Sequence, residues 1–298
     1  MLAEHSPSDG HKVQRNVISH EDLFRTEAAD EWPDLAEHTW ILAHKAIAHD
    51  LEDTSEALER MANEVELESW EIDLMKLWWS RCAENIVLHH SQEEEILFPY
   101  LRSKMDIPSH VSEEHEALLA LMPRVAKAFE GLGDSTVPED CLRLIDQLEE
   151  CMVPHMRGEE IAILPVMMKH FKPREILRIE REMVKGLSPL DLPHFYRPFG
   201  RDMETKREHF QRSKGKPGFV FDFFASKAFE EYDDVYTYAI DVLKAPHKKG
   251  WLDEQRMMRY ASNNRGVACV PGGAHAPGLD SRRASATITP AAPAPVPV

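Results

Sequence analysis

Two stretches of sequence decide the fold: "HHSQEEEILFPYL" at residues 89–101 and "HMRGEEIAILPVM" at residues 155–167. In each, a histidine is followed four residues later by a glutamate, and a proline comes six residues after the glutamate. These are His89, Glu93 and Pro99 in the first stretch and His155, Glu159 and Pro165 in the second. Positions i and i+4 of a helix lie on one face, with Cβ atoms about 5–6 Å apart. Each pair can therefore converge on one ion, and the repeat indicates two related halves.

Both pairs continue the apolar stripe of a predicted helix. Over about residues 67–104 the stripe includes Leu74, Trp78, Cys82, Asn85 and Leu97, and over residues 138–170 it includes Leu144, Leu148 and Cys151. An isolated histidine–glutamate pair is usually a surface ion pair, but unpaired polar groups on a core-facing stripe are costly. Imidazole and carboxylate together suit divalent iron, manganese or zinc. The position of the pairs therefore favours metal ligation.

Two further predicted helices, about residues 33–61 and 109–129, supply one histidine each among aliphatic neighbours, His44 and His115. The chain then consists of two helix pairs in tandem, with short connections that favour an antiparallel four-helix bundle over residues 31–171. Such a bundle is all-α and brings two sets of two imidazoles and one carboxylate together at its core. The sequence predicts a binuclear site in which each glutamate is free to bridge the two ions.

The motifs resemble those of the hemerythrin-like (HHE cation-binding) family, including the EE-x3-FP and EE-x3-LP endings after the glutamates. The resemblance covers about residues 33–170 and implies a four-helix bundle that holds two iron ions in a non-haem di-iron centre. The ligands that it implies are His44, His89, Glu93, His115, His155 and Glu159.

The chain departs from the oxygen-carrying members of that family. They have a second histidine four residues from the first on the third helix, where Val111 and Leu119 stand here, and an aspartate five residues after the histidine of the fourth helix. Glu159 instead completes a His-x3-Glu pattern that is present on both the second and the fourth helix. This pattern is more similar to that of the iron-responsive domains of ubiquitin-ligase regulators, although the chain has no cysteine-rich RING segment. His90 lies about 100° from His89 around the helix, so we expect it, with Glu94, beside the ligands or at the rim.

The remaining segments differ in composition. Residues 1–30 are predicted to be a disordered lead-in and residues 266–298 a disordered tail rich in proline and alanine. Residues 172–265 are predicted to form a helical extension, in which the aromatic-rich stretch from about residue 217 to 243 fits helix or strand by propensity, and its helical surroundings favour helix.

Composition limits the partners. Thirty-five Lys and Arg against 52 Asp and Glu give a formal net charge of −17, which disfavours nucleic acid and anionic membranes as partners. The four cysteines have no zinc-type spacing, and the sequence shows neither a signal peptide nor an apolar run of about 18 residues. We expect a cytoplasmic protein that does not bind membranes.

Three functions fit these patterns. The first is binding of oxygen or another small diatomic ligand at the two irons. The second is an iron- or oxygen-sensing regulator whose C-terminal extension engages a protein partner, which the aromatic extension favours because a carrier needs no such addition. The third is an enzyme acting on oxygen, peroxide or nitric oxide. The chain has no Gly-rich phosphate loop and no nucleophile beside a base, so a binding protein is favoured over an enzyme.

Overall fold

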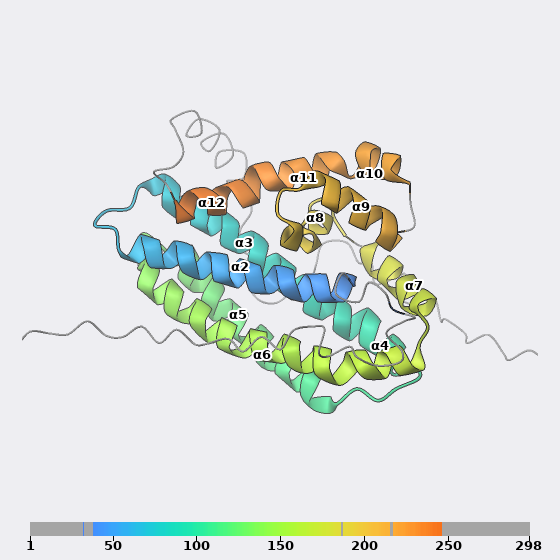
Figure 1. Ribbon diagram of the computed structural model, residues 1–298. Helices are drawn as coiled ribbons and strands as arrows, with labels where there is room; N and C mark the ends of the chain where they lie inside the picture. Colours follow the sequence, from blue (N-terminus) through green and yellow to red (C-terminus); the bar gives the residue numbers. More distant parts are fainter. Residues whose placement is uncertain (1–31, 33–37, 186, 215–216, 246–298) are drawn as a thin grey trace, which may run out of the picture.

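A four-helix bundle forms the main body of the protein. The computed structural model describes residue 32 and residues 38–185, 187–214 and 217–245. The bundle helices are α2 (Thr39–Ala62), α3 (Ser69–Gln92), α5 (Ser109–Gly131) and α6 (Pro138–His170). Each runs antiparallel to the next (Figure 1), so the predicted all-α antiparallel bundle is confirmed. The two termini predicted to be disordered, and residues 33–37 where the first helix was expected to begin, lie outside the described residues.

Local sequence explains where the helices begin and turn. Glu68 caps α3: its backbone N–H donates to the Glu71 carboxylate at 3.0 Å, which satisfies a group that the helix leaves unpaired. Pro138 opens α6 at a position that needs no N–H. Between α5 and α6, Gly133 has a φ of 84°, and a Cβ there would lie 2.6 Å from Ile72 Cδ1. The turn therefore requires glycine both for its backbone and for its close approach to α3.

A wide turn interrupts the second bundle helix at the candidate site. Residues Glu93–Leu97 form a π-helical turn between α3 and α4 (Phe98–Leu101), and the Phe98 N–H donates to the Glu93 carbonyl. Pro99 lacks an N–H and its ring would crowd the carbonyl four residues earlier in a regular α-helix. Widening the helix accommodates this ring, and π turns of this kind are frequent at functional sites.

Two of the three apolar clusters in the described residues fill the bundle, and the third joins the extension to Ala43 of α2. The first bundle cluster includes Leu51, Trp78 and Leu148, and the second, toward the opposite end, includes Ile41, Leu97 and Ile163. Along α2, α3 and α5 the histidines and glutamates of interest fall between the residues of the two clusters, and on α6 Glu159 does so while His155 lies beside Met156 at the edge of the first cluster. The bundle is thus a polar layer enclosed by two apolar ones, where electrostatic interactions are strong and unpaired polar groups are costly.

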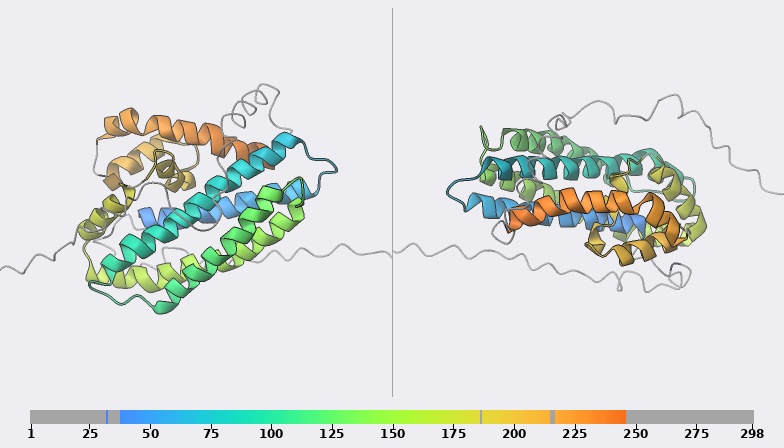
Figure 2. Two further views of the ribbon diagram at one scale, coloured as in Figure 1. Left: turned by 180° about the vertical axis from the view of Figure 1, so that it is seen from behind. Right: turned by 90° about the horizontal axis from the view of Figure 1, so that it is seen from above.

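The extension packs along one side of the bundle, next to α2 and α3 (Figures 1 and 2). The aromatic-rich stretch predicted to be helical, about residues 217–243, is confirmed as helix, and its last helix places Ile240 and Leu243 in the same apolar cluster as Leu51 and Trp78. Residues 246–265 of the predicted extension lie outside the described residues. The division of the chain at residue 171/172 stays a prediction. The elements of the extension are α7 (Pro173–Val184), α8 (Asp191–Phe195), a 3-10 turn (Arg197–Phe199), α9 (Met203–Lys214), α10 (Gly218–Phe224), α11 (Ser226–Tyr232), a π turn (Asp233–Thr237) and α12 (Tyr238–Lys244).

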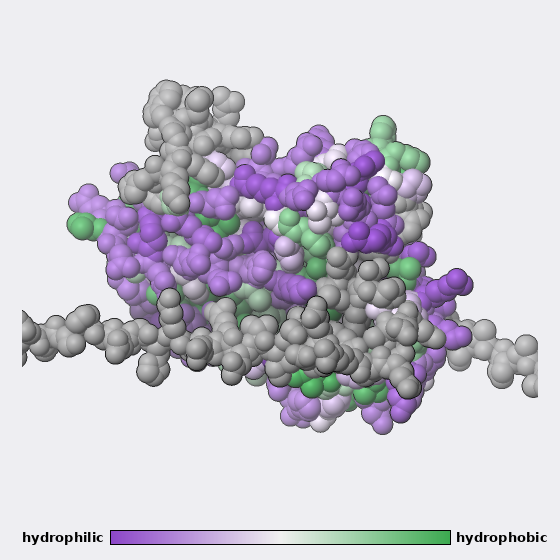
Figure 3. All heavy atoms as spheres, in the orientation of Figure 1, coloured by the Kyte–Doolittle hydropathy of each residue, from purple (hydrophilic) through white to green (hydrophobic). Residues whose placement is uncertain are grey.

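Hydrophilic side chains cover most of the described surface in Figure 3, as the net charge of −17 leads one to expect. No helix within the described ranges is long and apolar enough to cross a membrane.

Candidate metal centre

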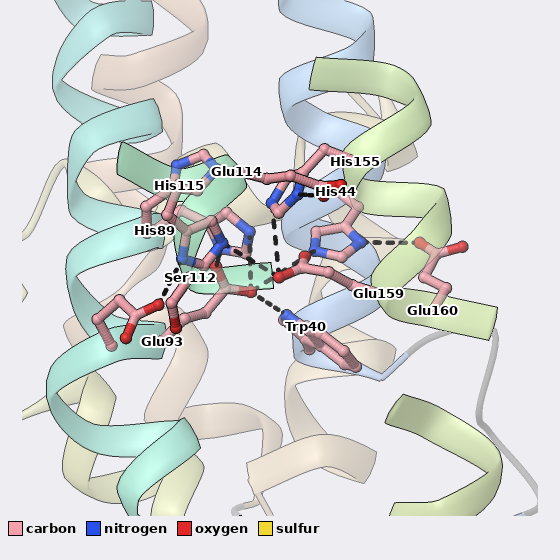
Figure 4. A network of polar contacts seen from close by, with 12 residues as sticks. Trp40, His44, His89, Glu93, Ser112, Glu114, His115, His155, Glu159 and Glu160 are labelled. Carbon is pink, nitrogen blue, oxygen red and sulfur yellow. Dashed lines mark hydrogen bonds and ion pairs between the residues drawn. The ribbon is translucent and has the colours of Figure 1, made fainter. Parts of the chain in front are cut away.

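All six residues singled out in the sequence lie in the polar layer, and their side chains point toward one another (Figure 4). Each is at most 4% exposed. A seventh residue, His90, is 0% exposed and joins them. By origin, His44 comes from α2, His89 and His90 from α3, Glu93 from the π turn, His115 from α5, and His155 and Glu159 from α6.

The first set, called here the two-histidine group, is His44 and His89. Their rings meet edge to face with centroids 5.0 Å apart. Glu93 Oε1 lies 3.2 Å from His89 Nε2 and 3.7 Å from His44 Nε2, while Glu159 Oε2 is 3.4 Å from His44 Nε2. These ligand atoms surround one small volume between α2, α3 and α6.

The second set, called here the three-histidine group, is His90, His115 and His155. The ring of His115 lies 4.7 Å from each of the other two rings. Each of the three offers a ring nitrogen within 4.8 Å of the others. Glu159 Oε1 is 3.1 Å from His115 Nε2 and 3.5 Å from His155 Nε2, and Glu93 Oε2 is 3.5 Å from His115 Nε2.

The two glutamates therefore divide their oxygens between the groups. Glu93 turns Oε1 to the two-histidine group and Oε2 to the three-histidine group. Glu159 does the same with its oxygens exchanged. With metal–ligand bonds of about 2.1 Å, neighbouring ligand atoms of one ion lie about 3.0–3.4 Å apart, close to the separations found here. The arrangement suits two ions bridged by two carboxylates.

Unpaired polar atoms test whether a metal fits. Within the described residues, six buried atoms of the layer have no hydrogen-bond partner: Nε2 of His44, His89, His90 and His155, and Oε2 of Glu93 and Glu159. A buried polar atom without a partner costs about 1–3 kcal/mol, so six of them in one place would be a heavy penalty. Metal ions between them would satisfy all six.

Comparison with known proteins agrees with this chemistry. Residues 35–165 and 106–187, together just over half of the 298-residue chain, match the family model described as the hemerythrin HHE cation binding domain. The chain belongs to this family. Neither the curated proteins nor the solved structures give a match.

Carboxylates outside the candidate ligand set hold the histidine rings in place. The Nδ1 atoms of three histidines contact carboxylates: His44 with Glu160 at 2.9 Å, His115 with Glu94 at 2.9 Å, and His155 with Glu114 at 2.8 Å. Such contacts keep the proton on Nδ1 and turn Nε2 inward as a ligand. Neither Glu114 nor Glu160 was singled out in the sequence, where the only signal that they carry is an acidic residue next to a candidate ligand.

His90 is buried among the candidate ligands, whereas the sequence led us to expect it beside them or at the rim. Its Nδ1 lies 2.7 Å from the Ile86 carbonyl, and its Nε2 is buried without a hydrogen-bond partner among the described residues. His89 and His90 both face inward because α3 packs against α2 on one side and α5 on the other. Glu94 does lie beside the ligands, holding His115.

Burial and charge divide the histidines into two protonation classes in the metal-free site. Burial lowers the pKa of His44, but its hydrogen bond to Glu160 and the nearby carboxylate of Glu93 outweigh it and raise this pKa to about 10. The pKa of His115 is also raised, because contacts with Glu159 and Glu93 outweigh its burial. Burial lowers the pKa of His90 to about 4.

The glutamates diverge in the same way. Burial and the nearby charge of Glu93 raise the pKa of Glu159 to about 7. Burial alone would raise the pKa of Glu93, but the nearby imidazoles of His89 and His44 hold it well below its usual range. Metal ligands bind in their deprotonated form, so a metal ion in the layer would compete with protons at the three groups whose pKa is raised, His44, His115 and Glu159.

Proposed function

We propose that the chain holds two divalent ions in the polar layer and that these ions are iron, as membership of the hemerythrin HHE family suggests. One ion would be held by His44 and His89, the other by His90, His115 and His155, with Glu93 and Glu159 shared. The observation that carries the proposal is the pair of glutamates, each with one oxygen facing each histidine group. Two buried carboxylates placed together are expected to repel unless cations lie between them.

The two positions are unequal. Counting the shared glutamates, the chain would supply four ligands at the two-histidine group and five at the three-histidine group. Six-coordinate iron would then have more open positions beside His44 and His89. When bound, the iron pair supplies redox chemistry and a place for an exogenous ligand. The chain encloses that place in apolar clusters, and Trp40 Nε1 holds Glu93 Oε1 in position by a hydrogen bond.

The function that this arrangement supports best is binding of, or reaction with, oxygen or a related small diatomic molecule. Purified protein is expected to contain about two irons per chain, and its iron(II) form is expected to change its visible absorption when mixed with oxygen. Metal analysis and absorbance after anaerobic mixing test both statements. Protein that stays metal-free after iron loading would overturn the metal centre; iron-loaded protein unaltered by oxygen would overturn the choice of ligand.

A sensing role through a protein partner is a second candidate. It is favoured by α12, which packs against α2 and α3, the helices that carry His44, His89 and His90. Ligand-dependent shifts of these helices would reach the extension directly. Limited proteolysis with and without iron tests the idea: equal cleavage of the extension in both states would contradict it.

His90 offers a sharp test of the five-ligand position. Replacing it by leucine keeps the site filled and apolar but removes one nitrogen from the three-histidine group. We expect His90→Leu to bind the second iron equivalent about 10- to 100-fold more weakly. The first iron equivalent should be retained. Chelator competition measures both affinities. His110→Leu, at an exposed position of α5, is the matched control, and equal binding by the two variants would remove His90 from the ligand set.

Metal binding is expected to release protons. Since the pKa of His44 is raised to about 10, this imidazole is protonated at neutral pH and competes with the metal. Apparent affinity should therefore rise with pH between about 7 and 10, by about tenfold per pH unit for each proton displaced. A pH indicator in weakly buffered solution reports the release. Glu160→Gln removes the carboxylate that holds the His44 proton, so metal binding to this variant should release fewer protons. A metal affinity that does not change with pH would contradict this account.

A further inference from the structure

An apolar pocket lies between the extension and the bundle, outside the ligand set described above. The bundle lines it with Trp40, Ala43 and Leu97, and the extension lines it with Ile176, Met183 and Phe195. Its cavity is about 30 Å³, and one water needs about 10–15 Å³. The space therefore suits a molecule of a few atoms and is too small for a typical organic substrate, for which pockets of about 300–1,000 Å³ are usual.

The pocket reaches the candidate metal centre on one side only. His89 of the two-histidine group lines it, whereas no member of the three-histidine group does. Trp40 connects the pocket with the candidate metal centre, because it lines the pocket and its Nε1 donates to Glu93 Oε1. A molecule in the pocket would thus lie beside the half of the layer that has fewer protein ligands.

Polar contacts hold helix α7 over the pocket as its outer wall. Gln92 lines the pocket from α3, but its Nε2 donates to the Met183 carbonyl at 3.1 Å. At the rim, His38 Nε2 forms an ion pair with Glu180 Oε1 at 3.2 Å. Within the described residues, Nδ1 of His38, Nε2 of His89 and Oε1 of Glu180 have no hydrogen-bond partner but are buried, so the surface that the lining offers to an occupant is mainly that of apolar side chains.

We propose that this pocket is the entry and holding site for a small uncharged diatomic molecule, such as oxygen or nitric oxide, on its way to the two-histidine group. The inference rests on the proposed function and extends it, because it names the class of ligand and gives α7 and α8 a role. Anions lose their hydration in an apolar space at a high cost, and peroxide would exchange its hydrogen bonds with water for a largely apolar lining. A small apolar molecule has neither a charge to desolvate nor strong hydrogen bonds with water to lose on entering.

Xenon is the probe, because it is uncharged and binds apolar cavities that stay dry. The metal-free full-length chain is examined by 129Xe NMR, so that the result does not depend on iron. The variant Val184→Trp places a large ring on a residue that lines the pocket, and Met183→Trp does so one residue earlier. Val137→Trp, at a position that is 54% exposed just before α6, is the matched control. Circular dichroism establishes that each variant is folded.

We expect a xenon shift in the unaltered chain and in Val137→Trp, and its loss in the two pocket variants. With iron bound to the same content, the pocket variants should react with oxygen about tenfold more slowly, because entry then requires the wall to move. Absence of the xenon shift in the unaltered chain would overturn the pocket. Xenon binding with an unaltered oxygen rate in both pocket variants would overturn its role in entry. Failure of the chain to bind iron, by contrast, would defeat the proposed function, which metal analysis reveals separately.

Discussion

Replacing Glu93 by alanine is expected to remove most of the iron from both positions, not from one. Glu93 gives one oxygen to each histidine group, so its loss takes a ligand and a negative charge from each ion at once. It also leaves the Trp40 N–H without its acceptor. From a starting content of about two irons per chain, we expect the variant to retain less than about a quarter.

Metal analysis after iron loading and desalting measures this result. Glu95→Ala is the matched control, since Glu95 belongs to the same π turn but is exposed. Iron should also raise the melting temperature of the unaltered chain and of Glu95→Ala by about 10 °C, because binding at about 1,000 times Kd contributes about 4 kcal/mol. Glu93→Ala should gain little. A variant that retains one full equivalent would show that Glu93 serves a single ion.

Much of the fold could be predicted because apolar spacing and proline positions act locally. Pro138 and Pro173 each mark the start of a helix found in the structure. The stripe that ends in His89 and Glu93 is buried as expected. Four helices with ligand pairs on two of them leave few ways to bury all the histidines, and an antiparallel bundle is one of them.

The errors arose where a helix has more than one inward face. His90 was expected beside the ligands or at the rim because it lies about 100° from His89, but a helix with neighbours on two sides buries an arc at least that wide. The opposite error occurred on α6, where Cys151 was expected in the core stripe and is exposed, while Met152 is buried. Single-helix periodicity fixes a stripe only to within about one residue, and the position of neighbouring helices decides the rest.

The link between the extension and the bundle could not be predicted, because it joins residues far apart in sequence. Asp50 of α2, which is 1% exposed, lies opposite Arg197 of the 3-10 turn, with Arg197 Nε 2.5 Å from Asp50 Oδ1. Arg197 also forms an ion pair with Asp53, and its guanidinium lies 4.6 Å from the ring centre of Trp78. A buried aspartate on a bundle helix, with a half-buried one a turn later, is explained by this arginine.

The variant Arg197→Met is expected to lose about 3–5 kcal/mol of unfolding free energy, because it leaves Asp50 buried without its cation. Methionine preserves the apolar contact with Trp78, so the loss should be mainly electrostatic. Arg201→Met is the matched control: Arg201 and Asp241 form an ion pair at 2.7 Å with side chains 49% and 46% exposed, and such pairs contribute about 0–1 kcal/mol. Urea denaturation of both variants, in the metal-free state, measures the difference.

The pH dependence of this loss separates charge from packing. Burial raises the pKa of Asp50 to about 7 even though Arg197 lowers it, and without Arg197 that pKa must rise further. A carboxyl with a raised folded-state pKa contributes stability that is fully present below its unfolded pKa and is lost as the pH rises through its folded pKa. In the unaltered chain this loss is complete somewhat above pH 7, whereas in Arg197→Met it continues upward by as much as about 1.4 kcal/mol per pH unit. The cost of the substitution should therefore be greater at pH 9 than at pH 6. An equal cost at both values would mean that Arg197 stabilises the junction through packing alone.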